Sequence, residues 1–130
     1  MSLQIGIPAP EFLLLDTDKK QTSLSQFRGQ NVVIFFFPFA FTSTCTEEMC
    51  TIQKDLSEYK SLNAVPIGIS IDTLYSLKVF KEMYKLDGVT LLSDFNKEAI
   101  RAYDVCIENY YNGYKGVAMR ATFLINKSKK

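Results

Sequence analysis

The residues that could do chemistry in this 130-residue chain are limited first by what the chain lacks. It contains no His, which excludes a Ser-His-Asp or Cys-His pair and any metal site built on His. Its three cysteines, Cys45, Cys50 and Cys106, are too few for a zinc site of four thiolates. Acid–base or nucleophilic chemistry must therefore come from Cys, carboxylate, Lys, Tyr, Thr or Arg side chains.

Cys45 stands at the beginning of a predicted helix, directly after a buried apolar segment. Residues 32–37 (VVIFFF) lack polar alternation, which indicates a strand buried on both faces and ended by Pro38. Residues 44–63 show helical periodicity, and Cys45 falls on the apolar face of that helix. A small buried hydrophobic residue and a reactive thiol both fit this position.

Three features favour a reactive thiol at Cys45. Helix N-termini stabilise a thiolate, and the hydroxyls of Thr42, Ser43 and Thr44 are available to donate to it. Arg120 lies in an otherwise apolar predicted strand, residues 117–125. An arginine there either reaches water at the sheet edge or forms a fixed cation that faces Cys45 and Glu48.

The remaining elements predict how these side chains are positioned. A short strand is expected near residues 12–15, further strands at 65–71 and 89–92, helices at about 73–86 and 97–103, and a Tyr-rich loop at 106–116. This alternation predicts one α/β domain, residues 1–130, with a central, mostly parallel sheet and helices on both faces. Ligands of such sheets bind beyond the carboxyl ends of the strands, which here means residues 38–46.

Composition narrows the class of protein further. A net charge of +1 argues against strongly basic nucleic-acid binding or a polybasic membrane patch. The longest apolar run, residues 32–41, is too short to cross a bilayer. The N-terminal segment does not resemble a signal peptide, and three cysteines is an odd number, so we expect a cytoplasmic protein with reduced thiols.

Several segments together resemble the peroxiredoxins, the alkyl hydroperoxide reductase and thiol-specific antioxidant family. Pro38-x-x-x-Thr42-x-x-Cys45 is similar to the active-site motif of that family. The likeness covers nearly all of residues 6–126, through GIPAPEF, LSQFRGQNVVIFFFPFAFTSTCT, IGISIDT, LLSDFNKEAIRAYDV and RATFLIN. The resemblance implies a thioredoxin-like fold that reduces hydrogen peroxide and alkyl hydroperoxides without a metal or other cofactor. A thioredoxin-like or small-thiol reductant is the implied partner.

The resemblance also implies a role for each residue of the motif. Cys45 is the peroxidatic nucleophile, which peroxide converts to a sulfenic acid. Thr42 and Arg120 hold the peroxide oxygens, Pro38 shields the pocket from water, and Glu48 orients the arginine.

The second thiol leaves alternatives open. Cys50 follows Cys45 by five residues, and this resembles the bacterioferritin-comigratory subgroup, in which the resolving cysteine lies in the same helix. Cys106 matches no motif and is interpreted as structural or as a second candidate. A mechanism with one working cysteine, resolved by an external thiol, stays open beside both.

The C-terminal end of the chain and its oligomeric state give two further expectations. The family usually continues beyond RATFLIN with another strand and a helix, so the chain looks short at its C-terminus, and a homodimer is compatible with it.

The hypotheses that compete with a peroxidase are a non-catalytic or peroxide-sensing thioredoxin-like module and a disulfide oxidoreductase that acts on proteins.

Overall fold

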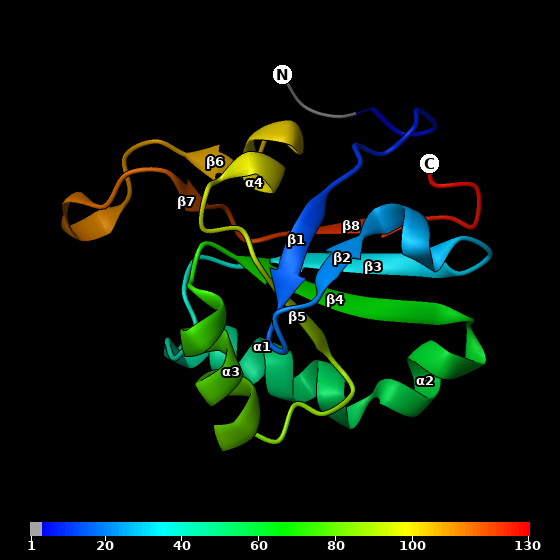
Figure 1. The fold of residues 1–130 in the computed structure, drawn as a ribbon, viewed down its shortest axis with the longest axis horizontal. Coiled ribbons are helices and arrows are strands. Elements are labelled where there is room, and N and C mark those ends of the chain that lie inside the picture. The colour runs from blue at the N-terminus through cyan, green and yellow to red at the C-terminus, as the bar shows by residue number, and fades with distance from the viewer. Residues whose placement is uncertain (1–3) are drawn as a thin grey trace.

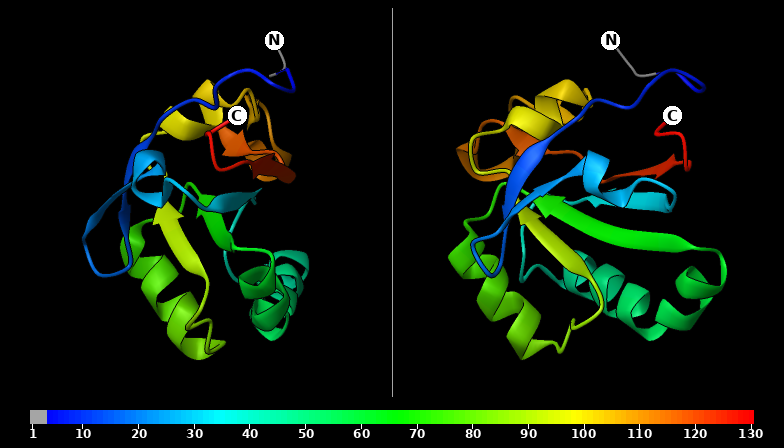
Figure 2. Two further views of the ribbon diagram at one scale, coloured as in Figure 1. Left: turned by 90° about the vertical axis from the view of Figure 1, so that its right-hand side faces the viewer. Right: turned by 45° about the vertical axis from the view of Figure 1, so that its right-hand side comes forward.

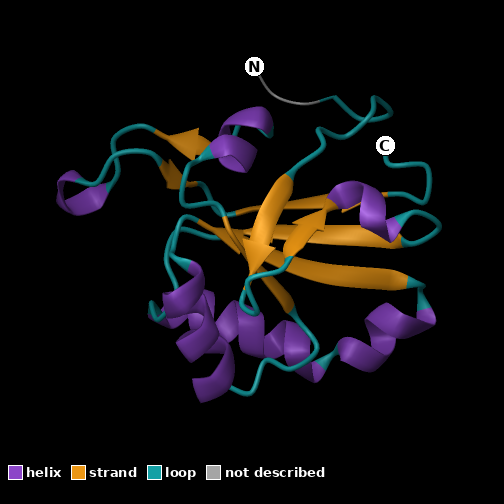
Figure 3. Cartoon of the chain, in the orientation of Figure 1, coloured by secondary structure: helices purple, strands orange, loops and turns teal. Residues whose placement is uncertain are grey.

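The apolar run after Gln30 forms the strand around which the protein is built. In the computed structural model, which describes residues 4–130, strand β3 (Asn31–Phe36) lies inside a six-stranded sheet (Figures 1 and 3). Its neighbours in the sheet are β1 (Leu13–Asp16), β2 (Gln21–Ser23), β4 (Ala64–Ser70), β5 (Thr90–Ser93) and β8 (Ala121–Ile125). The spatial order is β2-β1-β5-β4-β3-β8.

The sheet is parallel in its centre and antiparallel at both edges. Strands β3, β4 and β5 run parallel, whereas β8 pairs antiparallel with β3, and β1 pairs antiparallel with β5 and with β2. The expectation of a mostly parallel sheet is therefore right for the centre and wrong at the edges. The periodicity of a strand reports burial of its two faces and carries no signal of its direction.

Four helices and two 3-10 turns connect these strands. They are α1 (Ser43–Lys54), α2 (Leu56–Ser61), α3 (Leu74–Met83), α4 (Glu98–Ala102), η1 (Leu24–Phe27) and η2 (Tyr111–Gly113). The single helix predicted over 44–63 is divided at Asp55, whose φ and ψ of −97° and 18° leave the helical region. None of the helices within residues 4–130 is long and apolar enough to cross a membrane.

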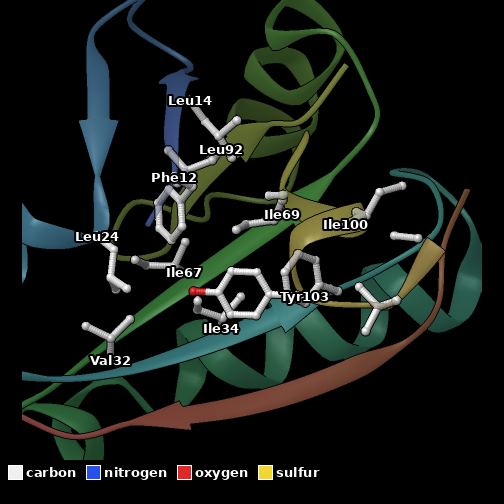
Figure 4. Close-up of a cluster of buried hydrophobic side chains, with 14 of the residues drawn as sticks. Phe12, Leu14, Leu24, Val32, Ile34, Ile67, Ile69, Leu92, Ile100 and Tyr103 are labelled. Atoms are coloured by element: carbon white, nitrogen blue, oxygen red, sulfur yellow. The ribbon is translucent and has the colours of Figure 1, made fainter. Parts of the chain in front are cut away.

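Helices α1 and α3 cover one face of the sheet and α4 lies over the other (Figure 2). Each face has its own cluster of buried side chains. On the face under α4, Val32 and Ile34 are fully buried in one cluster with Tyr103 (Figure 4). The ring of Phe36, which is also fully buried, lies 5.4 Å from that of Tyr103. The Tyr103 hydroxyl satisfies its polar atom by donating to the carbonyl of Pro10 at 2.7 Å. On the face under α1 and α3, a second cluster includes Met49, Leu77 and Phe80.

Gly68 brings α1 close to the sheet. A Cβ atom at this position of β4 would lie 2.8 Å from Leu91, 3.1 Å from the Met49 sulfur and 3.2 Å from Phe37. These distances are shorter than ordinary van der Waals contacts, so helix α1 packs against bare backbone here.

The Tyr-rich segment forms a small hairpin that the sequence does not predict. Strands β6 (Cys106–Ile107) and β7 (Val117–Ala118) pair antiparallel as a separate two-stranded sheet, with η2 at the far end. The hairpin projects beyond the strand ends that lead into α1 (Figure 1). The chain then turns at Met119 and Arg120 into β8, which is shorter than the predicted 117–125 strand.

Candidate active site

The loop after β3 delivers Cys45 to the first turn of α1. Residues 37–42 lead from the strand to the helix, and Pro38 is buried within them. Phe41 adopts a φ of 70°, in the left-handed region that bulky residues rarely occupy. A backbone in this conformation is kept only where its surroundings fix it, so the loop is a constrained connection.

Cys45 is fully buried and is the third residue of α1. The first intrahelical bond of the helix runs from the amide of Thr46 to the carbonyl of Thr42, at 2.9 Å. The amides of residues 43–45 precede it and therefore have no acceptor within the helix. Thr42, the N-cap residue, makes no side-chain capping bond, and the first turn contains no acidic residue. The thiol thus lies at the positive end of a helix dipole without a competing carboxylate in that turn.

Arg120 supplies a cation to this thiol. Its Nη1 donates to the Cys45 sulfur at 3.2 Å. The register explains the approach, because Ala121 pairs with Phe36 at the end of β3 and Arg120 directly precedes Ala121. The Arg120 side chain is 38% exposed, so it reaches Cys45 from the sheet edge while touching solvent. Both interpretations of this residue from the sequence are therefore partly met.

Glu48 is the second group that lies beside the Arg120 guanidinium. Its Oε1 lies 4.0 Å from the Arg120 Nη1 and has no hydrogen-bond partner among the described residues. Burial raises the pKa of Glu48 above its usual value, and the neighbouring Arg120 offsets part of that rise. The carboxylate is thus held within reach of the guanidinium without neutralising it through a direct bond.

The hydroxyls expected to face the thiol have other positions in this structure. Thr42 Oγ1 donates to the carbonyl of Phe39 at 3.0 Å, which closes the loop on itself. Ser43 and Thr44 are exposed. The donor that contacts the Cys45 sulfur is therefore the guanidinium of Arg120.

The other two cysteines lie in different settings, and all three thiols are free. Cys50 is in the same helix as Cys45 and is half-buried against the cluster under α1. Cys106 is in β6, where its thiol contacts Glu108 Oε1 at 3.3 Å. Burial and the Glu108 carboxylate raise the pKa of the Cys106 thiol, which keeps it protonated.

Aromatic side chains flank the loop on both sides. Phe39 packs against Tyr114 and Tyr110 of the hairpin, with ring centroids 5.3 and 6.0 Å away. Phe41 packs against Phe80 of α3 at 5.1 Å. The sequence indicates the Tyr-rich loop but not its contact with Phe39, because that contact joins segments about 70 residues apart.

Sequence reasoning missed the side chain that anchors the loop. Asp72, two residues beyond β4, accepts a hydrogen bond from the backbone amide of Ala40 at 2.8 Å. A signal was present, since Ser70 and Asp72 are polar residues at the end of a buried strand. The partner is a backbone amide, which has no signature in the sequence.

A separate cavity and the potential metal ligands among residues 4–130 do not form a second candidate site. A cavity of about 400 Å³ lies between residues 4–9 and β8, and Cys45 does not line it. Residues 4–130 contain no group of three or more His, Cys, Asp or Glu side chains placed to hold a metal ion. The arrangement places a buried thiol beside a guanidinium, which suits nucleophilic attack on a small polar electrophile.

Comparison with known proteins gives one consistent result. Residues 5–130 match the AhpC/TSA family. A putative peroxiredoxin, bcp, of Haemophilus influenzae is 40% identical over 128 residues, which cover 97% of this chain and 81% of that protein. The crystal structure of the peroxidoxin BcpB of Mycobacterium tuberculosis superposes with a TM-score of 0.87 at 29% identity, covering 96% of this chain and 80% of that one.

A further solved structure adds a chemical detail. The bacterioferritin comigratory protein of Xanthomonas campestris, for which alkyl peroxide reduction is described, superposes with a TM-score of 0.83. It is 28% identical, and the match covers 92% of this chain and 76% of that chain.

Proposed function

The chain belongs to the AhpC/TSA family of peroxiredoxins, and from this premise we propose that Cys45 is the thiol that peroxide oxidises. The protein has the thioredoxin-like α/β fold and is a thiol-dependent peroxidase. Its substrates are peroxides, and a thioredoxin-type thiol reductant returns it to the reduced state. The assignment of individual residues is the new part of this proposal.

The observation that carries the assignment is the 3.2 Å contact between Arg120 Nη1 and the Cys45 sulfur at the first turn of α1. The guanidinium and the free amides of the helix stabilise the thiolate. The thiolate attacks one peroxide oxygen, an S–O bond forms, and the O–O bond breaks with its electron pair on the leaving oxygen. Sulfur is oxidised to a sulfenic acid, and the leaving oxygen takes a proton from solvent to become water or an alcohol.

Arg120, Thr42, Pro38 and Glu48 have supporting roles in the proposal. Arg120 stabilises the charge that develops on the leaving oxygen, in the manner of an oxyanion site. Thr42 is placed to turn its hydroxyl from the Phe39 carbonyl towards a bound peroxide. Buried Pro38 offers no N–H and excludes water, and Glu48 orients the guanidinium.

Cys50 is proposed to resolve the sulfenic acid. Its thiolate attacks the Cys45 sulfur, an S–S bond forms, and the sulfenic oxygen leaves as water after protonation. Five residues of helix give a rise of about 7.5 Å along the axis and turn the side chains about 140° apart, which is too far for a disulfide. The first turns of α1 must therefore unwind after oxidation, and the helix break at Asp55 supports this because α2 need not move with α1.

The finer partners and setting complete the proposal. Hydrogen peroxide and alkyl hydroperoxides are both substrates, and the alkyl peroxide reduction described for the Xanthomonas protein supports the second class. The reductant is thioredoxin itself or a small thiol. We place the protein in the cytoplasm, where thiols are kept reduced, and a homodimer is compatible with the proposal.

Mass spectrometry after one equivalent of hydrogen peroxide tests the proposal. The reduced wild type should gain one oxygen on Cys45 and then lose the elements of water as a 45–50 disulfide forms. Cys45→Ser should show neither product and should lower peroxide turnover by at least about a thousandfold. Substantial turnover by this variant would overturn the assignment of the nucleophile.

Cys50→Ser separates the resolving step from the first one. This variant should react with its first equivalent of peroxide like the wild type, and then accumulate sulfinic acid on Cys45 unless an external thiol is added. Cys106→Ser is the matched control, and it should form the 45–50 disulfide normally. If no 45–50 disulfide appears and Cys50→Ser turns over like the wild type, the enzyme uses one cysteine.

A further inference from the structure

Asp72 connects the active-site loop to the centre of the sheet. Its Oδ2 accepts two hydrogen bonds, one from the Ala40 amide at 2.8 Å and one from the Ser70 hydroxyl at 2.6 Å. Its own carbonyl accepts from the Ser93 hydroxyl at 2.6 Å. Ser70 and Ser93 are the last residues of β4 and β5, so Asp72 is fixed to two strands of the parallel centre, through its carboxylate to β4 and through its backbone carbonyl to β5.

The bond to Ala40 holds the loop at its most constrained point. Ala40 is nearly buried and directly precedes Phe41, whose φ of 70° is a conformation that costs a bulky residue free energy. Thr42 follows, with its hydroxyl on the Phe39 carbonyl, and α1 begins at the next residue. An acceptor at Ala40 therefore sets the direction from which the chain enters the helix that carries Cys45.

No other described side chain bonds to the loop from outside it. The remaining contact of this kind is between backbones, from the Phe37 amide to the Ile69 carbonyl at 3.1 Å, where the loop leaves the sheet. Between that point and α1, Asp72 is the one outside side chain among residues 4–130 that forms a hydrogen bond with the loop, in addition to the ring contacts of Phe39 and Phe41.

We propose that Asp72 is a positioning residue for the peroxidase reaction, which it serves by fixing the 37–42 loop through the Ala40 amide. The inference rests on the proposed function of Cys45. With the anchor in place, the start of α1 presents the Cys45 sulfur to Arg120 and to an incoming peroxide in one geometry. Without it, Phe41 relaxes to negative φ and the first turn of α1 shifts against Arg120, so the thiol is present but misaligned.

Two rate constants measured on the same protein test this role. The reaction of Cys45 with hydrogen peroxide needs the aligned site, whereas alkylation by iodoacetamide needs only an accessible thiolate. Asp72→Ala should slow the peroxide reaction about tenfold, the effect of one hydrogen bond to a charged group, without slowing alkylation equally. The ratio of the two rate constants therefore falls, and this ratio cancels any change in the thiolate population.

Asp72→Asn provides the conservative rescue. Its amide oxygen can accept from Ala40 and Ser70, so its ratio should lie within about threefold of the wild type. Ser70→Ala removes the hydroxyl that orients the carboxylate, and it should lower the ratio by a smaller factor than Asp72→Ala. These two variants carry the test if Asp72→Ala does not fold.

Thr73→Ala is the matched control for loss of stability. Thr73 caps α3 by accepting from the Ser76 amide at 3.2 Å, so the variant loses stability at the neighbouring position without touching the loop. Its ratio should equal that of the wild type. An unchanged ratio in Asp72→Ala, or a ratio in Asp72→Asn as low as in Asp72→Ala, would overturn the positioning role. A wild-type Cys45 that does not react with peroxide would instead overturn the proposed function.

Discussion

The N-termini of α1 and α4 differ in whether their free backbone amides have a side-chain acceptor. At α4, the buried carboxylate of Asp94 accepts from the amides of Glu98, Ala99 and Ile100 at 2.8–3.1 Å. At α1, the N-cap residue Thr42 makes no capping bond. One helix has its free amides satisfied by a carboxyl group, and the other keeps them free.

The difference between the two ends teaches where an anion can be generated. A carboxylate at α1 like that of Asp94 would occupy the free amides and repel a thiolate. The open end, together with Arg120 at 3.2 Å from Cys45, instead favours negative charge on sulfur. Helix α1 lacks the stability that a capping side chain would give its first turn, and the proposed chemistry of Cys45 depends on this uncapped end.

The largest effect is expected where the open end loses its cation. Arg120→Met should slow the reaction of Cys45 with peroxide by about a hundredfold, the scale of losing one charge-stabilising donor. It should also slow alkylation of Cys45 by iodoacetamide at a fixed pH, because the sulfur loses its cationic partner. Quenched-flow mass spectrometry measures the peroxide reaction, and the rate of carbamidomethylation measures the alkylation.

Arg101→Met is the matched control for this variant. Arg101 lies in the last turn of α4 and is exposed, so its loss removes the same charge from the chain without touching Cys45. Its peroxide rate should match that of the wild type. An alkylation rate in Arg120→Met equal to that of the wild type would show that the guanidinium does not act on the thiol.

A loss of stability without loss of reaction is expected at the closed end. Asp94→Ala leaves three amides at the start of α4 without their acceptor, and it should lower the free energy of unfolding by about 2 kcal/mol. Urea unfolding followed by circular dichroism measures this change. The peroxide rate constant of the folded fraction should be unchanged, and a tenfold slower reaction would contradict the separation of the two ends.

The smallest effect concerns the pH dependence at Glu48. The pKa of Glu48 is raised in the folded protein, so the folded state favours the protonated carboxyl group. The stability that protonation of Glu48 contributes is complete below pH 4.5 and is lost as the pH rises through the folded pKa. Glu48→Gln should therefore raise the Tm at pH 7 by no more than about 3 °C. The gain should shrink as the pH falls towards 4.5.

Glu47→Gln serves as the control for this measurement, because Glu47 is exposed on the same turn of α1. Its Tm should differ from that of the wild type by the same small amount at both pH values. A Glu48→Gln variant that is less stable than the wild type at pH 7 would mean that the ion pair with Arg120 outweighs the cost of burying the carboxylate.

Much of the fold is predictable from residue types and spacing. The buried run at 32–37 and the apolar face shared by Cys45, Met49 and Ile52 predict β3 and α1 in the right order. The position of Cys45 after the carboxyl end of a central strand follows from this order. Asp72 and Thr73 are both suitable cap residues at the start of the predicted 73–86 helix, and the structure assigns the cap of α3 to Thr73.

The errors concern properties that the sequence does not encode locally. The direction of β8 depends on the turn at Met119 and Arg120, and the contact of Arg120 with Cys45 depends on the pairing of β8 with β3. The anchoring of the loop by Asp72 involves a backbone amide, which every residue except proline carries. Such contacts appear only when the chain is folded.

Gly68 sets the distance between helix α1 and the sheet. The missing side chain lets the Met49 sulfur lie against β4, and Met49 is one turn of α1 beyond Cys45. The thickness of the layer between helix and sheet is therefore set at position 68, while the reach of Arg120 is set from β8 on the far side of β3. A methyl group at Gly68 would have to displace Leu91, Met49 and Phe37, and the helix would rest farther from the sheet than the arginine is placed to reach. The length of one side chain is thus matched to the absence of another.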